Sequence, residues 1–276
     1  MRLRFTKMHG LGNDFVVIDG INQVFKPTPE RIRKLSDRHF GVGCDQVLLV
    51  EIPQQPDVDF SYRIFNYDGE EVENCGNGAR CFAKFVRDRK LTGLRSIRVQ
   101  TCCGLMTLNV EHSGDITVDM GTPILSPQAI PTTYTNQQTL YALPTSMGEK
   151  HIGAVSMGNP HAVLQVEDVK TAPVLELGAE IERHLHFPKR VNAGFMAVKS
   201  RTEIDLRVFE RGVGETLACG TGACAAVVAA QLQGLVDSTV KVNLPGGSMQ
   251  IQWQGEGSPV LMTGPANSVY HGQITL

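Results

Sequence analysis

Two stretches of the chain alternate between apolar and polar residues and predict matching strands. Residues 60–66 alternate around Tyr62 and Ile64, and residues 204–210 alternate in the same way. Alternation over about 4 to 8 residues is typical of a strand with one buried face. Further short strands, separated by glycine, proline and aspartate turns, are predicted at residues 96–101, 105–110, 116–119, 239–244, 249–253 and 260–262.

A helix is predicted after Cys75. Apolar residues recur at helical spacing over residues 79–86, whereas Arg80, Lys84 and Arg87 fall on the opposite face. An apolar stripe of this width is typical of a helix that packs one side against a core. The pattern therefore predicts a helix that is half exposed.

A second helix is predicted from Thr221 to about Gly234, and its pattern differs from the first. Residues 223–230 are apolar at every position, which indicates burial on all sides. Because short strands follow both helices, we expect each helix to lie at the centre of a curved sheet.

The two strand–helix stretches are copies of one another. One set of residues recurs at a constant separation in sequence: Arg63, Phe65, Glu71, Cys75, Gly76, Gly78 and Ala79 recur as Arg207, Phe209, Glu215, Cys219, Gly220, Gly222 and Ala223. At nearly the same separation, Asn13 matches Asn159 and Gln46 matches Asn192. A repeat of about 140 residues is far longer than the 20 to 50 residues of solenoid repeats, so it indicates a duplicated domain.

The predicted fold class is α+β, with two pseudo-symmetric duplicated domains. Each is expected to be a curved, mostly antiparallel sheet wrapped around a central helix, with the active site in the cleft between the two. The N-terminal domain is predicted at residues 1–119, with residues 266–276 returning to it, and the C-terminal domain at residues 120–265. A chain of 276 residues suits two domains of about 100 to 150 residues each.

The charge and hydropathy of the chain exclude several classes of partner. Its 26 basic and 28 acidic residues give a net charge of −2, so there is no basic surface of the kind that binds nucleic acid. No apolar run approaches the roughly 20 residues of a membrane span, and residues 1–12 lack the apolar core of a secretory signal. We therefore expect a cytoplasmic protein with a small-molecule partner.

The chain contains seven cysteines, which are expected to stay reduced in the cytoplasm. Their spacing does not match that of zinc sites, so no metal is expected. Small buried hydrophobes are expected at Cys44, Cys81, Cys102, Cys103 and Cys224. Cys75 and Cys219 differ from these, because a glycine turn, a helix start and the duplication coincide at both positions.

A cysteine at a helix start can act as a base. The unpaired amides and aligned peptide dipoles of the first turn stabilise a thiolate, and can lower the pKa from about 8.5 to about 3.5–7.5. The same amides bind anions such as a carboxylate. Two such thiols that face one carbon could move a proton from one side of it to the other.

Several stretches of the sequence resemble the diaminopimelate epimerase family. They are residues 7–15 (KMHGLGNDF), 38–46 (RHFGVGCDQ), 158–161 (GNPH), 191–195 (VNAGF), 210–212 (ERG) and 262–266 (MTGPA), together with both cysteine repeats. This resemblance covers essentially the whole chain. It departs from the pattern of many relatives at Thr221, where serine is common, but the hydroxyl is kept.

The resemblance implies an epimerase without pyridoxal phosphate or another cofactor, which interconverts LL- and meso-diaminopimelate on the route to lysine and peptidoglycan. It implies that Cys75 and Cys219 are the acid and base, assisted by His161 and Glu210. The substrate-binding residues that it implies are Asn13, Gln46, Asn66, Gly76, Asn77, Asn159, Asn192, Glu210, Arg211, Gly220 and Thr221. It also implies a homodimer with Tyr270 at the interface.

Alternative interpretations of these residues remain open. The asparagines could form turns, Glu210 and Arg211 could form a surface ion pair, and His161 could be packed in a core. At the level of function, a different two-cysteine racemase acting on proline or hydroxyproline would share the cysteines but would not need Arg211. A thiol redox or ligand-binding protein is the other alternative, although the chain has no Cys-x-x-Cys pair.

Overall fold

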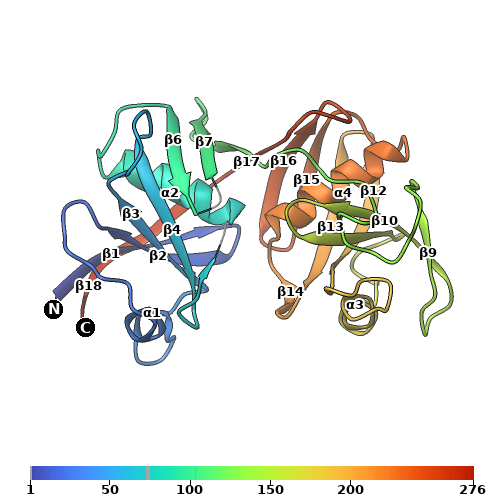
Figure 1. The fold of residues 1–276 in the computed structure, drawn as a ribbon, viewed down its shortest axis with the longest axis horizontal. Helices are drawn as coiled ribbons and strands as arrows, with labels where there is room; N and C mark the ends of the chain where they lie inside the picture. Colours follow the sequence, from blue (N-terminus) through green and yellow to red (C-terminus); the bar gives the residue numbers. More distant parts are fainter. Residues whose placement is uncertain (1, 73–74, 103) are drawn as a thin grey trace. The chain divides into compact units, whose positions relative to one another are not determined.

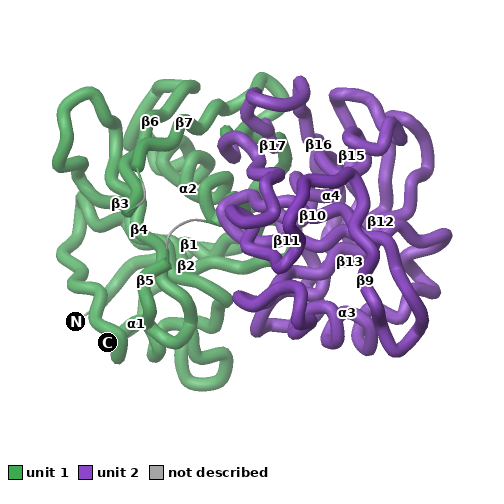
Figure 2. The backbone as a smooth tube through the Cα atoms, turned by 45° about the vertical axis from the view of Figure 1, so that its right-hand side comes forward, with its two compact units in different colours: residues 1–119, 263–276 green, residues 120–262 purple. Residues whose placement is uncertain are grey.

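The computed structural model describes residues 2–72, 75–102 and 104–276 (Figure 1). The chain forms two compact units, drawn in separate colours in Figure 2. Unit 1 consists of Met1–Asp119 and Thr263–Leu276, and unit 2 of Met120–Met262. The C-terminal segment of the chain therefore belongs to the same unit as its N-terminal part.

Unit 1 is a sheet in the order β18-β1-β2-β3-β4-β6-β7-β8 with β5 paired to β4. The pairs β2–β3 and β4–β6 are parallel and the others antiparallel. Its strands are β1 (Arg2–Gly10), β2 (Asn13–Asp19), β3 (Gln46–Glu51), β4 (Phe60–Asn66), β5 (Glu71–Val72), β6 (Ser96–Thr101), β7 (Gly104–Val110), β8 (Ile116–Asp119) and β18 (Asn267–Thr275). Helix α1 (Pro29–Ser36) joins β2 to β3, and α2 (Gly76–Asp88) joins β5 to β6.

Unit 2 repeats this arrangement, in the order β9-β10-β11-β12-β13-β15-β16 with β14 paired to β13. Its strands are β9 (Tyr141–Leu143), β10 (Lys150–Ser156), β11 (Pro160–Gln165), β12 (Asn192–Ser200), β13 (Glu203–Glu210), β14 (Gly214–Thr216), β15 (Thr239–Leu244) and β16 (Gly247–Trp253). Helix α3 (Val174–Glu182) joins β11 to β12, α4 (Gly220–Leu232) joins β14 to β15, and β17 (Val260–Gly264) leads out of the unit.

The connectivity of the two units confirms the predicted duplication. In each unit, a helix connects two parallel strands, β2 and β3 in unit 1 and β11 and β12 in unit 2. An antiparallel hairpin follows, formed by β4 and β5 or by β13 and β14. A second helix then leads to a strand that is parallel to the first strand of this hairpin, so that β6 pairs with β4 and β15 with β13. Helix α2 packs against β1, β2, β3, β7, β8 and β18, and α4 against β10, β11, β12, β13 and β16. The predicted fold, a mostly antiparallel sheet around a central helix in each half, is confirmed.

The prediction that the first helix is half exposed is wrong. Residues 76–83 of α2 are all buried, and the Arg80 side chain is fully buried at 0% exposure. Its guanidinium donates hydrogen bonds to Asn77 Oδ1 (2.8 Å) and to the Pro265 carbonyl (3.1 Å). Burial of this charge is possible because the segment that follows β17 supplies an acceptor that the local sequence does not reveal.

Helix α4 is buried on all sides, as its sequence predicts. The small residues of α4 also allow close packing against the sheet. A Cβ atom added to Gly153, on β10, would lie 2.8 Å from Ala229 Cβ, so this strand reaches the helix only because Gly153 has no side chain.

The structure tests four of the five cysteines that were expected to be buried hydrophobes. Cys44, Cys81 and Cys224 are buried, which confirms the prediction for them. For Cys102 it is wrong: the residue is exposed in the turn between β6 and β7, where its Sγ lies 3.7 Å from the Val72 carbonyl. A turn of this kind leaves no sheet face to cover the side chain. Cys103 lies outside the described residues.

Candidate active site

Cys75 is the N-cap of α2, with extended backbone angles of φ −146° and ψ 113°. The carbonyl of Cys75 accepts the Ala79 N–H (2.8 Å), which closes the first turn of the helix. Its thiol lies 3.6 Å from Asn13 Oδ1, and Asn77 Nδ2 lies 3.4 Å from the same oxygen. Asn13 therefore brings the start of β2 against the start of α2.

Cys219 is the N-cap of α4 in the same conformation, with φ −120° and ψ 107°. Its thiol donates to Glu210 Oε2 at 3.1 Å and lies 3.6 Å from Thr221 Oγ1. The other carboxylate oxygen of Glu210 accepts a hydrogen bond from Thr216 Oγ1 (2.5 Å). The second half of the chain therefore places a carboxylate and one hydroxyl beside its cysteine, and a second hydroxyl, that of Thr216, binds the carboxylate.

The expectation that a helix start lowers the thiol pKa is wrong for Cys219. Burial, followed by the negative charge of Glu210, raises the pKa of this thiol well above its ordinary value. The hydroxyl of Thr221 and the Gly222 N–H act in the opposite direction but do not outweigh these effects. Cys219 is therefore a protonated thiol at neutral pH, with Glu210 as the acceptor of its proton.

Two predicted site residues of unit 1 lie opposite each other at one edge of the sheet. Gln46 begins β3 and Asn66 ends β4, and the two are paired across the strands. Gln46 Nε2 donates to Asn66 Oδ1 at 2.9 Å, whereas the buried Oε1 of Gln46 accepts no hydrogen bond within the described part of the chain. A buried oxygen without a hydrogen-bond partner is uncommon in folded proteins, so this position is a candidate for contact with a ligand.

His161 and Asn159 form a pair in unit 2. His161 is 1% exposed, and its Nε2 lies 3.0 Å from Asn159 Oδ1. Burial lowers the pKa of His161 to about 3, and the positive charge of Arg211 adds to this effect. The imidazole is therefore neutral at pH 7, because it is desolvated.

Asn192 connects three segments of unit 2. Its Nδ2 donates to the Pro160 carbonyl (3.1 Å), and its Oδ1 accepts the backbone N–H of Arg211 (2.8 Å). The Arg211 guanidinium is exposed and donates to the Lys189 carbonyl at 3.2 Å. The side chains of Glu210 and Arg211 thus turn to different partners, which does not fit the interpretation of these neighbours as a surface ion pair.

The remaining predicted residues lie at helix starts and on the last strand. Gly76 and Gly220 are the first residues of α2 and α4, and both are buried. Tyr270 lies on β18 and is 45% exposed. Its ring makes an edge-to-face contact with the ring of Phe5, with 5.9 Å between the ring centroids.

Sequence reasoning missed Thr216 and Asp45. Thr216 binds Glu210, and Asp45 Oδ2 accepts the side-chain amide of Asn13 at 2.9 Å. A signal for Thr216 was present in the repeat, because the matching residue of the first half is Val72, so the hydroxyl occurs only in the half that also has Glu210.

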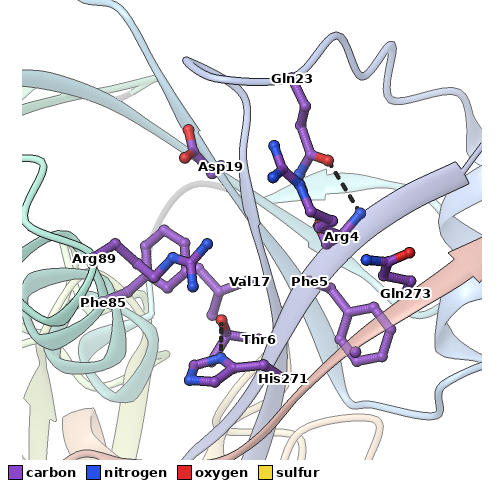
Figure 3. A pocket seen from close by; sticks show the side chains of 11 residues that line it. Arg4, Phe5, Thr6, Val17, Asp19, Gln23, Phe85, Arg89, His271 and Gln273 are labelled. Carbon is purple, nitrogen blue, oxygen red and sulfur yellow. Dashed lines mark hydrogen bonds between the residues drawn. The ribbon is translucent and has the colours of Figure 1, made fainter.

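A cavity of about 230 Å³ lies elsewhere in unit 1, between β1, β2, β18 and the C-terminal end of α2 (Figure 3). Arg4, Arg89 and His271 line it together with the apolar side chains of Val17 and Phe85. None of the predicted site residues contributes to its walls. Because Cys75 is at the opposite end of α2, this cavity is not the candidate active site.

The described residues contain no group of three or more His, Cys, Asp or Glu side chains that could hold a metal ion. Nor is any helix in this part of the chain long and apolar enough to cross a membrane.

Comparisons with known proteins agree with the sequence resemblance. The profile of the diaminopimelate epimerase family matches residues 5–126 and 153–269. A diaminopimelate epimerase from Teredinibacter turnerae is 63% identical over 276 residues, which is 100% of both chains.

Two solved structures share the fold at much lower identity. A hydroxyproline epimerase from Agrobacterium vitis with bound trans-4-OH-L-proline is 15% identical with a TM-score of 0.71, covering 99% of this chain and 92% of its own. A PhzF-family phenazine biosynthesis protein from Bacillus anthracis is 14% identical with a TM-score of 0.71, covering 100% of both chains. These two show the fold alone, whereas the family profile and the close relative show the family. This chain belongs to the diaminopimelate epimerase family.

Proposed function

We propose that this protein interconverts LL- and meso-diaminopimelate by proton transfer at one α carbon, without pyridoxal phosphate, in the synthesis of lysine and peptidoglycan precursors. Membership of the family supports this substrate. The observation that carries the mechanism is that Cys75 and Cys219 are each the N-cap of the matching helix in one of two duplicated units.

In the proposed reaction one cysteine, as a thiolate, removes the α proton, and the other, as a thiol, delivers a proton to the opposite face. The roles exchange in the reverse direction. The raised pKa of Cys219 and its contact with Glu210 support a resting state in which Cys219 carries the proton. Glu210 then takes that proton whenever Cys219 has to act as the base, and the neutral His161 assists proton exchange.

The reacting carboxylate would bind to the helix starts, at Gly76 and Asn77 of α2 and at Gly220 and Thr221 of α4. Backbone amides at a helix start stabilise the negative charge that develops when the α proton leaves. One such donor contributes about 3 to 4 kcal/mol, and an enzyme needs at least about 8 kcal/mol. A single donor does not supply this much, so we propose that donors from both helix starts act together at one substrate carbon.

The distal end of the substrate carries a second carboxylate and a second ammonium group. Arg211 would bind this carboxylate, because a guanidinium can donate two parallel hydrogen bonds to it. Gln46 would also contribute to the pocket, since its Oε1 has no hydrogen-bond partner among the described residues. The amides that would line the rest of the pocket are those of Asn13, Asn66, Asn159 and Asn192.

We also propose that the protein acts in the cytoplasm as a homodimer with Tyr270 at the interface, and that the boundary between its two domains lies near residues 119 and 120. Tyr270 is 45% exposed, so much of its side chain is available for contact with a second copy of the chain.

The proposed function is tested by incubating the purified protein with LL-diaminopimelate and separating the stereoisomers by chiral chromatography. We expect meso product, and a loss of roughly 10²- to 10⁴-fold in kcat/KM for Cys75→Ser and for Cys219→Ser, the range of a general acid or base. Activity on proline or hydroxyproline with none on diaminopimelate would select the racemase alternative. Reversible thiol oxidation without proton exchange at any substrate carbon would select the redox alternative.

A further inference from the structure

A buried carboxylate lies at the C-terminal end of α3 in unit 2. Glu182 is the last residue of this helix, and its side chain is 3% exposed. The position is unfavourable in two respects, because burial penalises a charge and the C-terminal end of a helix repels a negative one. A residue that breaks local rules in this way points to a role beyond packing.

The shortest contact of Glu182 is with a backbone amide. Its Oε1 accepts the Gly212 N–H at 2.9 Å, and Arg183 Nε and Arg190 Nη1 lie 3.2 and 3.5 Å from the carboxylate. The two arginines are 73% and 55% exposed, so solvent weakens their attraction. Although burial acts to raise it, the pKa of Glu182 is lowered, first by the Gly212 N–H.

Gly212 belongs to the turn between β13 and β14, which also contains Arg211. Helix α3 packs against both of these strands (Figure 1). Gly212 has a φ of +74°, and the turn is closed by the Val213 N–H, which donates to the Glu210 carbonyl (3.1 Å). Arg211 is therefore at the tip of an exposed turn, where its backbone would otherwise be free to move.

Two side chains from outside the turn hold its successive amides. Asn192 Oδ1 accepts the Arg211 N–H at 2.8 Å, and Glu182 Oε1 accepts the next N–H, that of Gly212. These bonds fix the peptide planes on both sides of the Arg211 Cα atom. The orientation of these two planes determines the direction of the Arg211 Cα–Cβ bond. It therefore sets the direction in which the side chain extends from the backbone.

The two halves of the chain differ at this point in a correlated way. Ser36 ends α1 at the position that matches Glu182 at the end of α3, and Tyr67 follows β4 where Arg211 follows β13. The carboxylate is present in the half that has the arginine and absent from the half that lacks it.

We propose that Glu182 is a positioning residue that holds the Arg211 turn in place and thereby sets the preference for a substrate with a second carboxylate. This inference rests on the proposed function, in which Arg211 binds the distal carboxylate. Glu182 acts through the Gly212 amide and does not touch the substrate.

The test compares Glu182→Leu, which removes the acceptor, with Glu182→Gln, which keeps one. We expect the leucine variant to raise KM for diaminopimelate by about 10- to 100-fold, the cost of a displaced binding group, with a much smaller change in kcat. The glutamine variant should stay close to the wild type. Glu180→Leu is the matched control, because Glu180 is on the same helix but binds Ser146.

L-lysine supplies the second readout, since it is diaminopimelate without the distal carboxylate. Exchange of the lysine α proton in heavy water should be equally slow in the wild type and in Glu182→Leu. Because the variant binds only diaminopimelate less well, the ratio of kcat/KM for diaminopimelate to that for lysine should fall. In an Arg211→Gln background, Glu182→Leu should have no further effect on KM. Glu182→Ser, which carries the residue of the first half, replaces the leucine variant if that variant does not fold.

An unchanged KM in Glu182→Leu, or an equal loss of activity in the Arg211→Gln background, would overturn this inference and leave the proposed function intact. A wild-type protein without activity on diaminopimelate would overturn the proposed function itself, and the inference with it.

Discussion

The pKa of the Cys219 thiol shows how burial and one neighbouring residue can outweigh the effect of a position at a helix start. A helix start favours a thiolate, yet burial and the Glu210 carboxylate keep this thiol protonated. The helix start of Cys219 could be predicted from the glycine turn. The effect of Glu210 could not, because it depends on β13 bringing the carboxylate within 3.1 Å of the sulfur.

Glu210→Gln should lower the pKa of Cys219, because it removes a negative charge that opposes the thiolate. Alkylation of Cys219 by iodoacetamide, followed by peptide mass spectrometry across a pH series, measures this change. We expect the midpoint of the alkylation profile of Cys219 to move to lower pH in this variant. A Cys219 midpoint that stays in place or rises would show that Glu210 does not control this thiol.

His161 should make the folded state less stable in acid. Its pKa in the folded protein is about 3, below the 6.5 of the unfolded chain, so the unfolded state binds the extra proton between these values. The free energy of unfolding should therefore fall by a few kcal/mol as the pH decreases from about 6.5 toward 3.

Urea unfolding at several pH values measures this loss of stability. In His161→Asn, the free energy of unfolding should change less with pH between about pH 4 and pH 6.5 than it does in the wild type. His151→Asn is the control, because the His151 side chain is 61% exposed, and it should show the same pH dependence of the free energy of unfolding as the wild type. Equal slopes in the wild type and in His161→Asn would contradict the buried, neutral state of His161.

At the scale of elements, local patterns predicted the strands and helices that alternate or repeat clearly. The predicted strands at 60–66 and 204–210 correspond to β4 and β13, and the fully apolar helix corresponds to α4. The crossover helices α1 and α3 and the parallel strand pairs that they connect were not predicted. Parallel pairing joins strands that are distant in sequence, and α1 is only 8 residues long, too short for a clear periodic signal.

The close packing of β10 on α4 gives a prediction at this scale. Gly153→Ala should lower the free energy of unfolding by about 1 to 3 kcal/mol, because the new methyl group would meet Ala229 Cβ at 2.8 Å. Chemical denaturation measures the change. Gly93→Ala is the control, since nothing lies within 4 Å of a Cβ at that position, and a similar loss in both variants would argue against the packing explanation.

At the scale of the whole molecule, the internal repeat was the strongest signal in the sequence. It predicted two related units, and the chain forms two compact units with the same connectivity. The repeat also shows where the halves diverge, since Glu210 and Arg211 replace Asn66 and Tyr67. Such divergence is expected if two similar helix starts serve one substrate whose two ends have to be distinguished.

Proton transfer by two different cysteines is tested most directly by NMR during the first turnovers of LL-diaminopimelate in heavy water. Two bases predict deuterium at the α carbon of the meso product, while the remaining LL substrate keeps its proton, because the group that removes the proton is not the group that returns one. Protium in the product, or equal early deuteration of substrate and product, would contradict the two-cysteine mechanism.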